Sequence, residues 1–178
     1  MTENLSSRAA SVELLILDVD GVLTDGGLYY DQHGSVTKRF HVQDGLGIKL
    51  AQAAGLHLAV MSGLTSDAVE ARVKELGIIH YHHGRLDKVR LMKELGHNLG
   101  LGLDQTAFLG DDWVDAGAML AAGLPMAVAN AQPEILNIAS WVSSRPGGHG
   151  AVREAIMFLL KARNQLADQW QQWISRHD

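Results

Sequence analysis

Five aspartates stand in two short clusters, and each cluster follows a run of apolar residues. Asp18 and Asp20 follow LLIL, and Asp111, Asp112 and Asp115 follow TAFLG. Short apolar runs of this kind are typical of strands buried on both faces of a parallel sheet. If the two strand ends converge, the crowded carboxylates repel one another, and some stay protonated unless a cation lies between them. Ligands that are all oxygen suit a hard cation, so the pattern indicates a Mg²⁺ site.

Two further residues could bind an anion beside these acids. Ser62 follows an apolar run and precedes Gly63, so its hydroxyl and the next backbone N–H groups could hold a phosphate where a helix starts. Lys88 lies near the start of a helical pattern, where the dipole does not favour a cation, and this position indicates an anionic partner. A nucleophilic aspartate, a second acid, a hydroxyl and a lysine are the groups for phosphoryl transfer through an aspartyl phosphate.

Each of these residues also has a structural explanation when it is taken alone. Asp112 or Asp115 would then be an ordinary acid in the first turn of a helix, where the dipole favours it. Ser62 would be a helix cap, and Lys88 would be a solvated surface lysine. The combination at several strand ends favours the catalytic interpretation.

The segments around these residues alternate between strand and helix patterns, which predicts an α/β domain with a mainly parallel sheet. The expected strands cover residues 14–18, 56–62, 77–82, 106–110, 125–130 and 140–144. The expected helices cover residues 44–55, 65–77, 86–96 and 115–123, with one long C-terminal helix over 149–174. Ligands bind at the carboxyl ends of the strands in open sheets of this class. Asp18, Ser62 and Asp111 all stand at such ends.

One segment interrupts the alternation, because residues 26–42 contain two β-prone arms around the turn-rich tetrapeptide Asp31–Gly34. This pattern predicts a β-hairpin that overhangs the carboxyl end of the first strand. Asp25 is expected to stabilise the turn into this hairpin and to take no part in catalysis. Too few residues separate Asp20 from Gly63 for a helical cap domain, so the hairpin is the expected cover.

Composition excludes several classes of protein. The chain has 178 residues, which predicts a single domain over 1–178 with a flexible start at 1–11. The formal charge is −5 and no basic run is present, so nucleic acid is not an expected partner. No apolar run is long enough to span a membrane. The N-terminus lacks the pattern of a secretory signal and the chain contains no cysteine, so a cytoplasmic protein is expected.

The motifs DVDGVLTDG, MSG, LDK and GDDWVD, in this order and at these separations, resemble the four motifs of the haloacid dehalogenase superfamily of phosphatases. RFHVQDGLGIKL after the hairpin and GGHGAVREA near the end are similar to the 3-deoxy-D-manno-octulosonate 8-phosphate phosphatases, and this resemblance covers residues 12–163. It implies a Rossmann-like core without a cap domain. It also implies hydrolysis of the octulosonate 8-phosphate in lipopolysaccharide biosynthesis.

The resemblance implies a role for each catalytic residue. Asp18 attacks the phosphorus, and Asp20 protonates the leaving oxygen and then deprotonates the water that hydrolyses the phosphoaspartate. Ser62 and Lys88 hold the phosphoryl oxygens, whose charge grows in the transition state.

The same resemblance implies which groups hold the metal. The carboxylate of Asp18, the backbone carbonyl of Asp20 and Asp111 bind Mg²⁺, whereas Asp112 and Asp115 orient these ligands and the metal's waters.

The resemblance further implies residues that meet the substrate. They are His41, Val42, Gln43, Asp44, Gly45, Lys49, Gly63 and Arg72. Family members of this kind form homotetramers in which hairpins and C-terminal segments of neighbouring subunits cover the site. From the residues alone, Arg72 could equally be a surface charge and His41 a packed strand residue.

Two departures leave the substrate open. Many relatives carry Arg where this chain has Gln43 and Leu64, and an Arg at either position suits a carboxylate. A nonulosonate 9-phosphate or a broader range of sugar phosphates is therefore a rival substrate. A binding subunit without catalysis is a competing hypothesis, and so is a phosphotransferase or phosphomutase, although no acceptor site for that last class can be identified.

Overall fold

The structure, a computed structural model, describes residues 5–175 and contains a parallel sheet of six strands. The strand order is β5-β4-β1-β6-β7-β8, with β1 over Leu14–Leu17, β4 over His57–Met61, β5 over His80–His82, β6 over Thr106–Gly110, β7 over Leu124–Ala127 and β8 over Trp141–Val142. The apolar runs of β1 and β6 are buried along their whole length, as strands covered on both faces require. The predicted α/β fold with a parallel sheet is confirmed.

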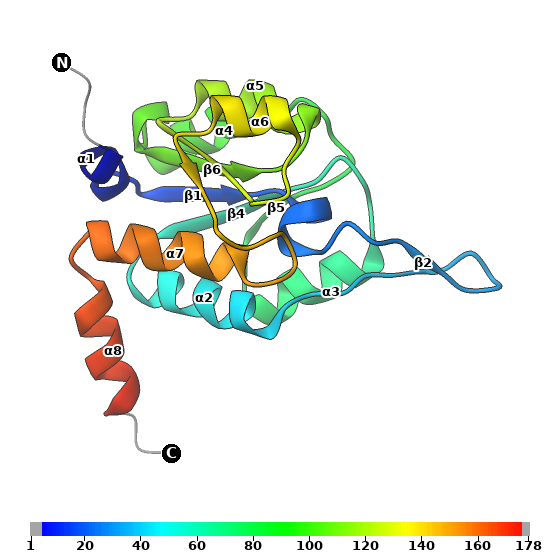
Figure 1. Cartoon of the computed structure of the whole chain (residues 1–178), viewed down its shortest axis with the longest axis horizontal. Helices are drawn as coiled ribbons and strands as arrows, with labels where there is room; N and C mark the ends of the chain where they lie inside the picture. Colours follow the sequence, from blue (N-terminus) through cyan, green and yellow to red (C-terminus); the bar gives the residue numbers. More distant parts are fainter. Residues whose placement is uncertain (1–4, 176–178) are drawn as a thin grey trace.

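Helices cover both faces of this sheet (Figure 1). One face carries α2 over Val42–Ala53, α3 over Asp67–Leu76 and α7 over Ala151–Ala162, and the other carries α4 over Lys88–Leu99, α5 over Trp113–Ala121 and α6 over Pro133–Ile138. A short helical turn over Leu103–Gln105 precedes β6. Because each strand is followed by a helix or a loop at the same edge, the residues after β1, β4 and β6 gather there.

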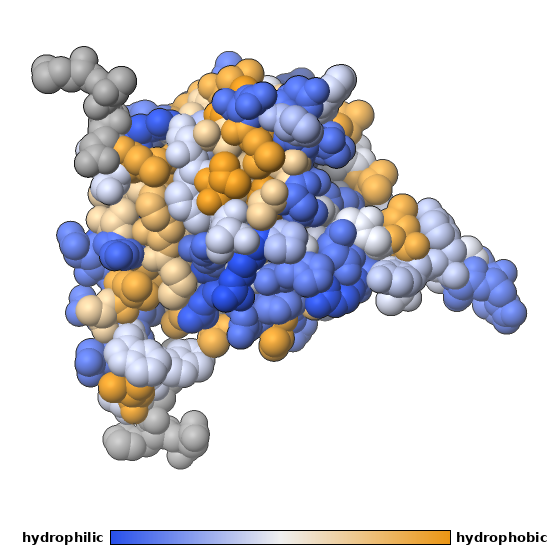
Figure 2. Space-filling model, in the orientation of Figure 1, coloured by the Kyte–Doolittle hydropathy of each residue, from blue (hydrophilic) through white to orange (hydrophobic). Residues whose placement is uncertain are grey.

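A β-hairpin projects beyond the body of the molecule (Figure 1). Its arms are β2 over Tyr29–Tyr30 and β3 over Val36–Thr37, which form an antiparallel sheet separate from the main one. The far end of the hairpin is hydrophilic on the face shown in Figure 2. Asp31 stabilises its turn, because its carboxylate accepts hydrogen bonds from the backbone of His33 and Ser35. The predicted hairpin is therefore present.

The C-terminal segment differs from the single long helix expected over 149–174. It forms two helices, α7 and then α8 over Leu166–Ile174, and they are separated at Asn164, whose φ of 57° lies in the left-handed region. Asn tolerates this conformation better than most residues, so the break is local. The preceding Arg163 forms an ion pair with Glu13 next to β1, and this contact anchors the end of α7.

The N-terminal segment also differs from the expected flexible start at 1–11. Within it, α1 covers Leu5–Ala10 and packs against α7, and residues 1–4 lie outside the described residues. Arg8 of this helix donates to the carbonyl of Gly123 and to the hydroxyl of Ser140. None of the helices within residues 5–175 is long and apolar enough to cross a bilayer.

Candidate active site

The strand register brings the predicted acids to one edge of the sheet. Leu17, the last residue of β1, pairs with Val60 of β4 and with Leu109 of β6. The three strands are parallel, so the residues that follow them emerge side by side at their carboxyl ends. Asp18 and Asp111 come from two of these strand ends, as the sequence predicted.

The chain leaves β1 through a tight turn over Val19–Leu23 that carries Asp20. The hydroxyl of Thr24 donates to the carbonyl of Val19 and accepts from the backbone N–H of Gly21, which closes this turn. Gly21 has a φ of 98°, and a side chain there would meet Asp111. β1 ends at Leu17, so Asp18 and Asp20 do not lie on one strand. The direction of the Asp20 side chain is therefore set by the turn and not by the alternation of side chains along a strand.

A loop that is distant in the sequence supports this turn. Gly148 donates a backbone hydrogen bond of 3.0 Å to the carbonyl of Val22. Gly147 lies directly against the carbonyl of Gly21, so that any side chain at 147 would overlap it. The GGHG segment therefore fixes the backbone that carries Asp20.

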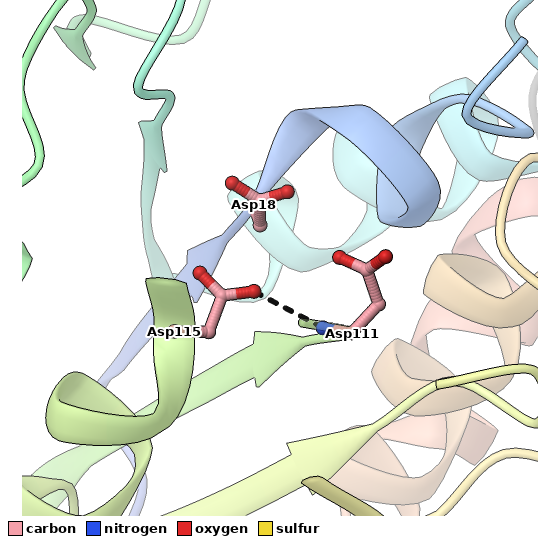
Figure 3. A group of neighbouring side chains, drawn as sticks. All are labelled: Asp18, Asp111 and Asp115. Carbon is pink, nitrogen blue, oxygen red and sulfur yellow. Dashed lines mark hydrogen bonds between the residues drawn. The ribbon is translucent and has the colours of Figure 1, made fainter. Parts of the chain in front are cut away.

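Three carboxylates converge at the centre of the site (Figure 3). One oxygen from each of Asp18, Asp111 and Asp115 lies within 4.8 Å of the others. Lys88, the first residue of α4, contacts two of them, because its Nζ lies 2.5 Å from Asp18 and 2.6 Å from Asp115. The second oxygen of Asp115 accepts the backbone N–H of Asp111 at 3.0 Å. Both oxygens of Asp115 are thus occupied, whereas those of Asp111 remain available.

Electrostatics favours a cation between these acids. Burial, followed by the nearby Asp115, raises the pKa of Asp18 to about 7 although Lys88 opposes the shift. Burial and the charges of Asp18 and Asp115 raise the pKa of Asp111 to about 8. The buried Oδ1 of Asp111 has no hydrogen-bond partner among the described residues. A divalent cation would satisfy this oxygen and offset the repulsion, so the residues present fit such an ion.

Lys88 carries its charge in a buried position. Burial lowers the pKa of this lysine, but Asp18 and Asp115 outweigh that effect and raise it, so the ammonium stays charged. It lies at the start of α4, as predicted, where the helix dipole does not favour a cation.

Ser62 follows β4 directly and is buried. Its backbone N–H donates to the carbonyl of His82 at 2.9 Å, and its Oγ accepts the N–H of Leu64 at 3.1 Å. The hydroxyl proton has no acceptor among the described residues, so it is free to donate to an anion. Gly63 comes next in the same turn, and the side chain of Leu86 lies against it.

Two of the other predicted acids serve the backbone. Asp112 is exposed at the N-cap of α5, where its carboxylate accepts the N–H of Trp113 at 2.7 Å. Asp25 accepts the N–H of Gly27 and pairs with Arg39 at the base of the hairpin, as expected for a turn residue.

The predicted substrate residues on α2 divide between its two sides. Asp44 is buried against α7 and accepts the N–H of Arg153 at 2.8 Å. The N-cap of α7 is Gly150, which has no side chain, so Asp44 replaces the missing cap. Gln43 lines a cavity of about 520 Å³ beside α7, whereas Val42 is exposed on the side of α3.

The remaining predicted substrate residues lie near α3 or the start of α2. Arg72 forms an ion pair with Glu75 and lies against Gly45. The Nζ of Lys49 donates to the carbonyl of Leu76 at 2.7 Å, at the end of α3 that faces away from the carboxyl edge.

His41 precedes α2 at its N-cap, and its Nδ1 is buried without a partner among the described residues.

Lys38 was not predicted from the sequence as a residue of the site. This residue follows β3, and its buried ammonium forms an ion pair with Oδ1 of Asp20. No spacing rule places a lysine of the return arm beside an acid that precedes the hairpin. The only available signal was a hairpin predicted to fold back over this edge of the sheet.

The comparisons with known proteins agree with this geometry. The central strand of the parallel sheet is followed by an acid pair, and a hydroxyl, a lysine and a second acid cluster lie at the same edge. This arrangement is that of a haloacid dehalogenase-like hydrolase. The model of that family matches residues 63–156. The chain is 40% identical over 161 residues to the 3-deoxy-D-manno-octulosonate 8-phosphate phosphatase of Haemophilus influenzae, covering 90% of this chain and 89% of that one. The chain belongs to the 3-deoxy-D-manno-octulosonate 8-phosphate phosphatase family.

Two solved structures are similar over most of their length. The phosphatase of this name from Moraxella catarrhalis, solved with magnesium, phosphate and the octulosonate, has a TM-score of 0.93 and 35% identity, covering 97% of this chain and 99% of that one. The cobalt-bound enzyme of H. influenzae has a TM-score of 0.88 and 39% identity, covering 92% and 99%.

Proposed function

We propose that the protein hydrolyses 3-deoxy-D-manno-octulosonate 8-phosphate to the free sugar acid and phosphate, with Mg²⁺ as its cofactor. The observation that carries this proposal is the convergence of Asp18, Asp111 and Asp115 at the carboxyl edge of the sheet, where the buried Lys88 contacts Asp18 and Asp115. The 40% identity to a phosphatase of that specificity supports the choice of substrate.

The chain's own residues account for both chemical steps. A carboxylate oxygen of Asp18 forms a bond to phosphorus while the bond to the sugar oxygen breaks, and Asp20 gives that oxygen a proton. Water then attacks the phosphoaspartate, Asp20 accepts its proton, and the bond between Asp18 and phosphorus breaks to release phosphate. Lys88 and the Ser62 hydroxyl stabilise the charge on the phosphoryl oxygens during both transfers.

Asp18, Asp111 and the backbone carbonyl of Asp20 would hold Mg²⁺, with Asp115 and Asp112 orienting them. When bound, the ion supplies positive charge that offsets the repulsion between phosphate and carboxylates. Asp115 suits an orienting role because Lys88 and the backbone of Asp111 occupy both of its oxygens.

The proposal includes a homotetramer in the cytoplasm, serving lipopolysaccharide biosynthesis, in which neighbouring subunits cover the site. Exposed aromatic residues on the hairpin and on α8 support this part, namely Tyr29, Tyr30, Trp170 and Trp173. Light scattering after gel filtration measures the mass, and a monomer at micromolar concentration would contradict the assembly.

The decisive experiment measures phosphate release by the wild type and by Asp18→Asn, with Mg²⁺ and with a chelator. Asn keeps the shape of the side chain but lacks the nucleophilic carboxylate, so turnover should fall by about 10⁴-fold or more. Asp104→Asn, an exposed acid at the opposite edge of the sheet, is the matched control and should retain full activity. Turnover by Asp18→Asn at the wild-type rate contradicts the mechanism.

The substrate is tested separately with the octulosonate 8-phosphate and a nonulosonate 9-phosphate side by side. The first should have the higher kcat/KM by at least about tenfold, which corresponds to about 1.4 kcal/mol in transition-state binding. A preference for the nine-carbon substrate would fit the departures at Gln43 and Leu64 and would replace the proposed substrate.

A further inference from the structure

A second buried lysine lies at the catalytic edge, and the two chemical steps give it no role. Lys38 follows β3 on the return arm of the hairpin, and only 3% of its side chain is exposed. Within the described residues its ammonium has one ion-pair partner, the Oδ1 of Asp20. A buried ammonium without a counter-ion is costly, so this contact restrains both side chains.

The contact fixes one oxygen of Asp20 and leaves the other available. Asp20 is 27% exposed, and its Oδ2 has no hydrogen-bond partner among the described residues. Its backbone is set independently, because the turn over Val19–Leu23 is closed by Thr24. Thr24 also pairs with Phe40 in an antiparallel bridge two residues beyond Lys38, so the base of the hairpin and the turn form one unit.

The two acids of the pair are therefore served by different lysines. Lys88 from α4 contacts Asp18 and Asp115 within the carboxylate cluster. Lys38 contacts Asp20, which is absent from that cluster. Since the two ammonium groups sit on separate elements, the nucleophile and the proton donor are held independently of each other.

We propose that Lys38 is a positioning residue that acts through Asp20, so that the seating of the hairpin controls proton transfer to the leaving group. This inference rests on the proposed function. The Lys38 ammonium holds Oδ1, and the proton moves from Oδ2 to the sugar oxygen as the electron pair of the breaking P–O bond stays on that oxygen. The carboxylate that remains on Asp20 is stabilised by the same ammonium, without any rearrangement.

The leaving group provides a direct test of this role. A sugar alkoxide needs a proton as it departs, whereas p-nitrophenolate is stable enough to depart without one. Lys38→Met removes the ammonium but keeps a side chain of similar length against Phe40 and Val42, which share a cavity with Lys38. The value of kcat/KM covers the steps through formation of the phosphoaspartate, so it excludes the later step in which Asp20 accepts a proton from water, and the comparison of the two leaving groups reports on proton donation.

Lys38→Met should lower kcat/KM for the octulosonate 8-phosphate by about 10²-fold, and for p-nitrophenyl phosphate by less than about threefold. Lys38→Arg should recover part of the loss, since it restores a cation. Lys161→Met, which replaces an exposed lysine of α7 in the same way, is the matched control and should treat the two substrates alike. An equal loss on both substrates, or a rise in KM alone for the sugar phosphate, overturns the inference and assigns Lys38 to the fold or to substrate binding.

A double-mutant cycle gives a second, independent measurement. If Lys38 acts through Asp20, then Lys38→Met should cost nothing further in the background of Asp20→Asn. Additive losses overturn the inference. The wild type distinguishes this failure from failure of the proposed function, because an inactive wild type, or an active Asp18→Asn, contradicts the phosphatase itself. Thermal unfolding of each variant confirms that it is folded.

Discussion

The site has two parts, its floor and its hairpin side, and different elements of the fold position them. The floor consists of Asp18, Asp111 and Asp115. Asp18 and Asp111 follow β1 and β6, two buried strands that pair with each other, and Asp115 lies on α5. The hairpin side carries Lys38 on a two-stranded arm that pairs with nothing in the main sheet. The floor is therefore set by the core, whereas the hairpin side depends on how one exposed arm is seated.

The largest expected loss of activity from a change beside the floor is at Lys88. Lys88→Met leaves three carboxylates without their buried cation and removes a donor to the phosphoryl group, so kcat should fall by about 10²–10³-fold. Steady-state phosphate release measures the change. Lys93→Met on the same helix is the control, and a kcat within twofold of the wild type for Lys88→Met would contradict the arrangement.

The floor responds to pH, because burial raises the pKa of Asp18 to about 7 and that of Asp111 to about 8. In the metal-free protein the folded state binds protons that the unfolded state has lost, so stability should fall as pH rises from about 4 to about 8. Mg²⁺ competes with these protons, and the rise in Tm that it causes should be larger at pH 8 than at pH 6.

Thermal unfolding at the two pH values, with Mg²⁺ and with a chelator, measures this difference. Asp111→Asn removes one of the two titrating acids and should reduce the dependence on pH. A Tm rise on adding Mg²⁺ that is the same at both pH values would contradict the electrostatic account.

The smallest predicted effect is a loss of stability at Asp44, which lies in the first turn of α2, the helix that follows the hairpin. Asp44→Ala removes the acceptor that caps α7, so stability should fall by about 1–2 kcal/mol in urea unfolding. KM should change less than about threefold, because the carboxylate faces α7. Asp168→Ala, an exposed acid of α8, should change stability by less than about 0.5 kcal/mol. A large rise in KM with stability unchanged would instead support substrate binding by Asp44.

The same contrast explains what could be predicted from the sequence. Short apolar runs followed by polar residues indicate the strands and the edge where they end, so Asp18, Ser62 and Asp111 could be located in advance. The pairing of Lys38 with Asp20 depends on how the hairpin docks, which no local pattern specifies. The break at Asn164 was missed for a related reason, because helical spacing of apolar residues continues across it.

The substrate residues implied by resemblance were harder to place than the catalytic ones. Lys49 was assigned to a sugar acid by analogy, and its ammonium donates to the carbonyl of Leu76, so its contact with a substrate stays a prediction. Asp44 was assigned in the same way, and its carboxylate caps a helix that begins more than a hundred residues later, so its contact with a substrate stays a prediction. Position within a motif identifies the segment, but the direction of a side chain depends on the packing between helices.

The contact between Gly147 and Gly21 has a consequence for the order in which the enzyme matures. The turn that carries Asp20 precedes the loop that supports it by most of the core, so it leaves the ribosome well before that loop. Contacts of such long sequence separation form late because the intervening chain must first be ordered. A nascent chain therefore carries Asp18 and Asp20 well before this support exists, and the turn takes its final form only when the GGHG segment has docked.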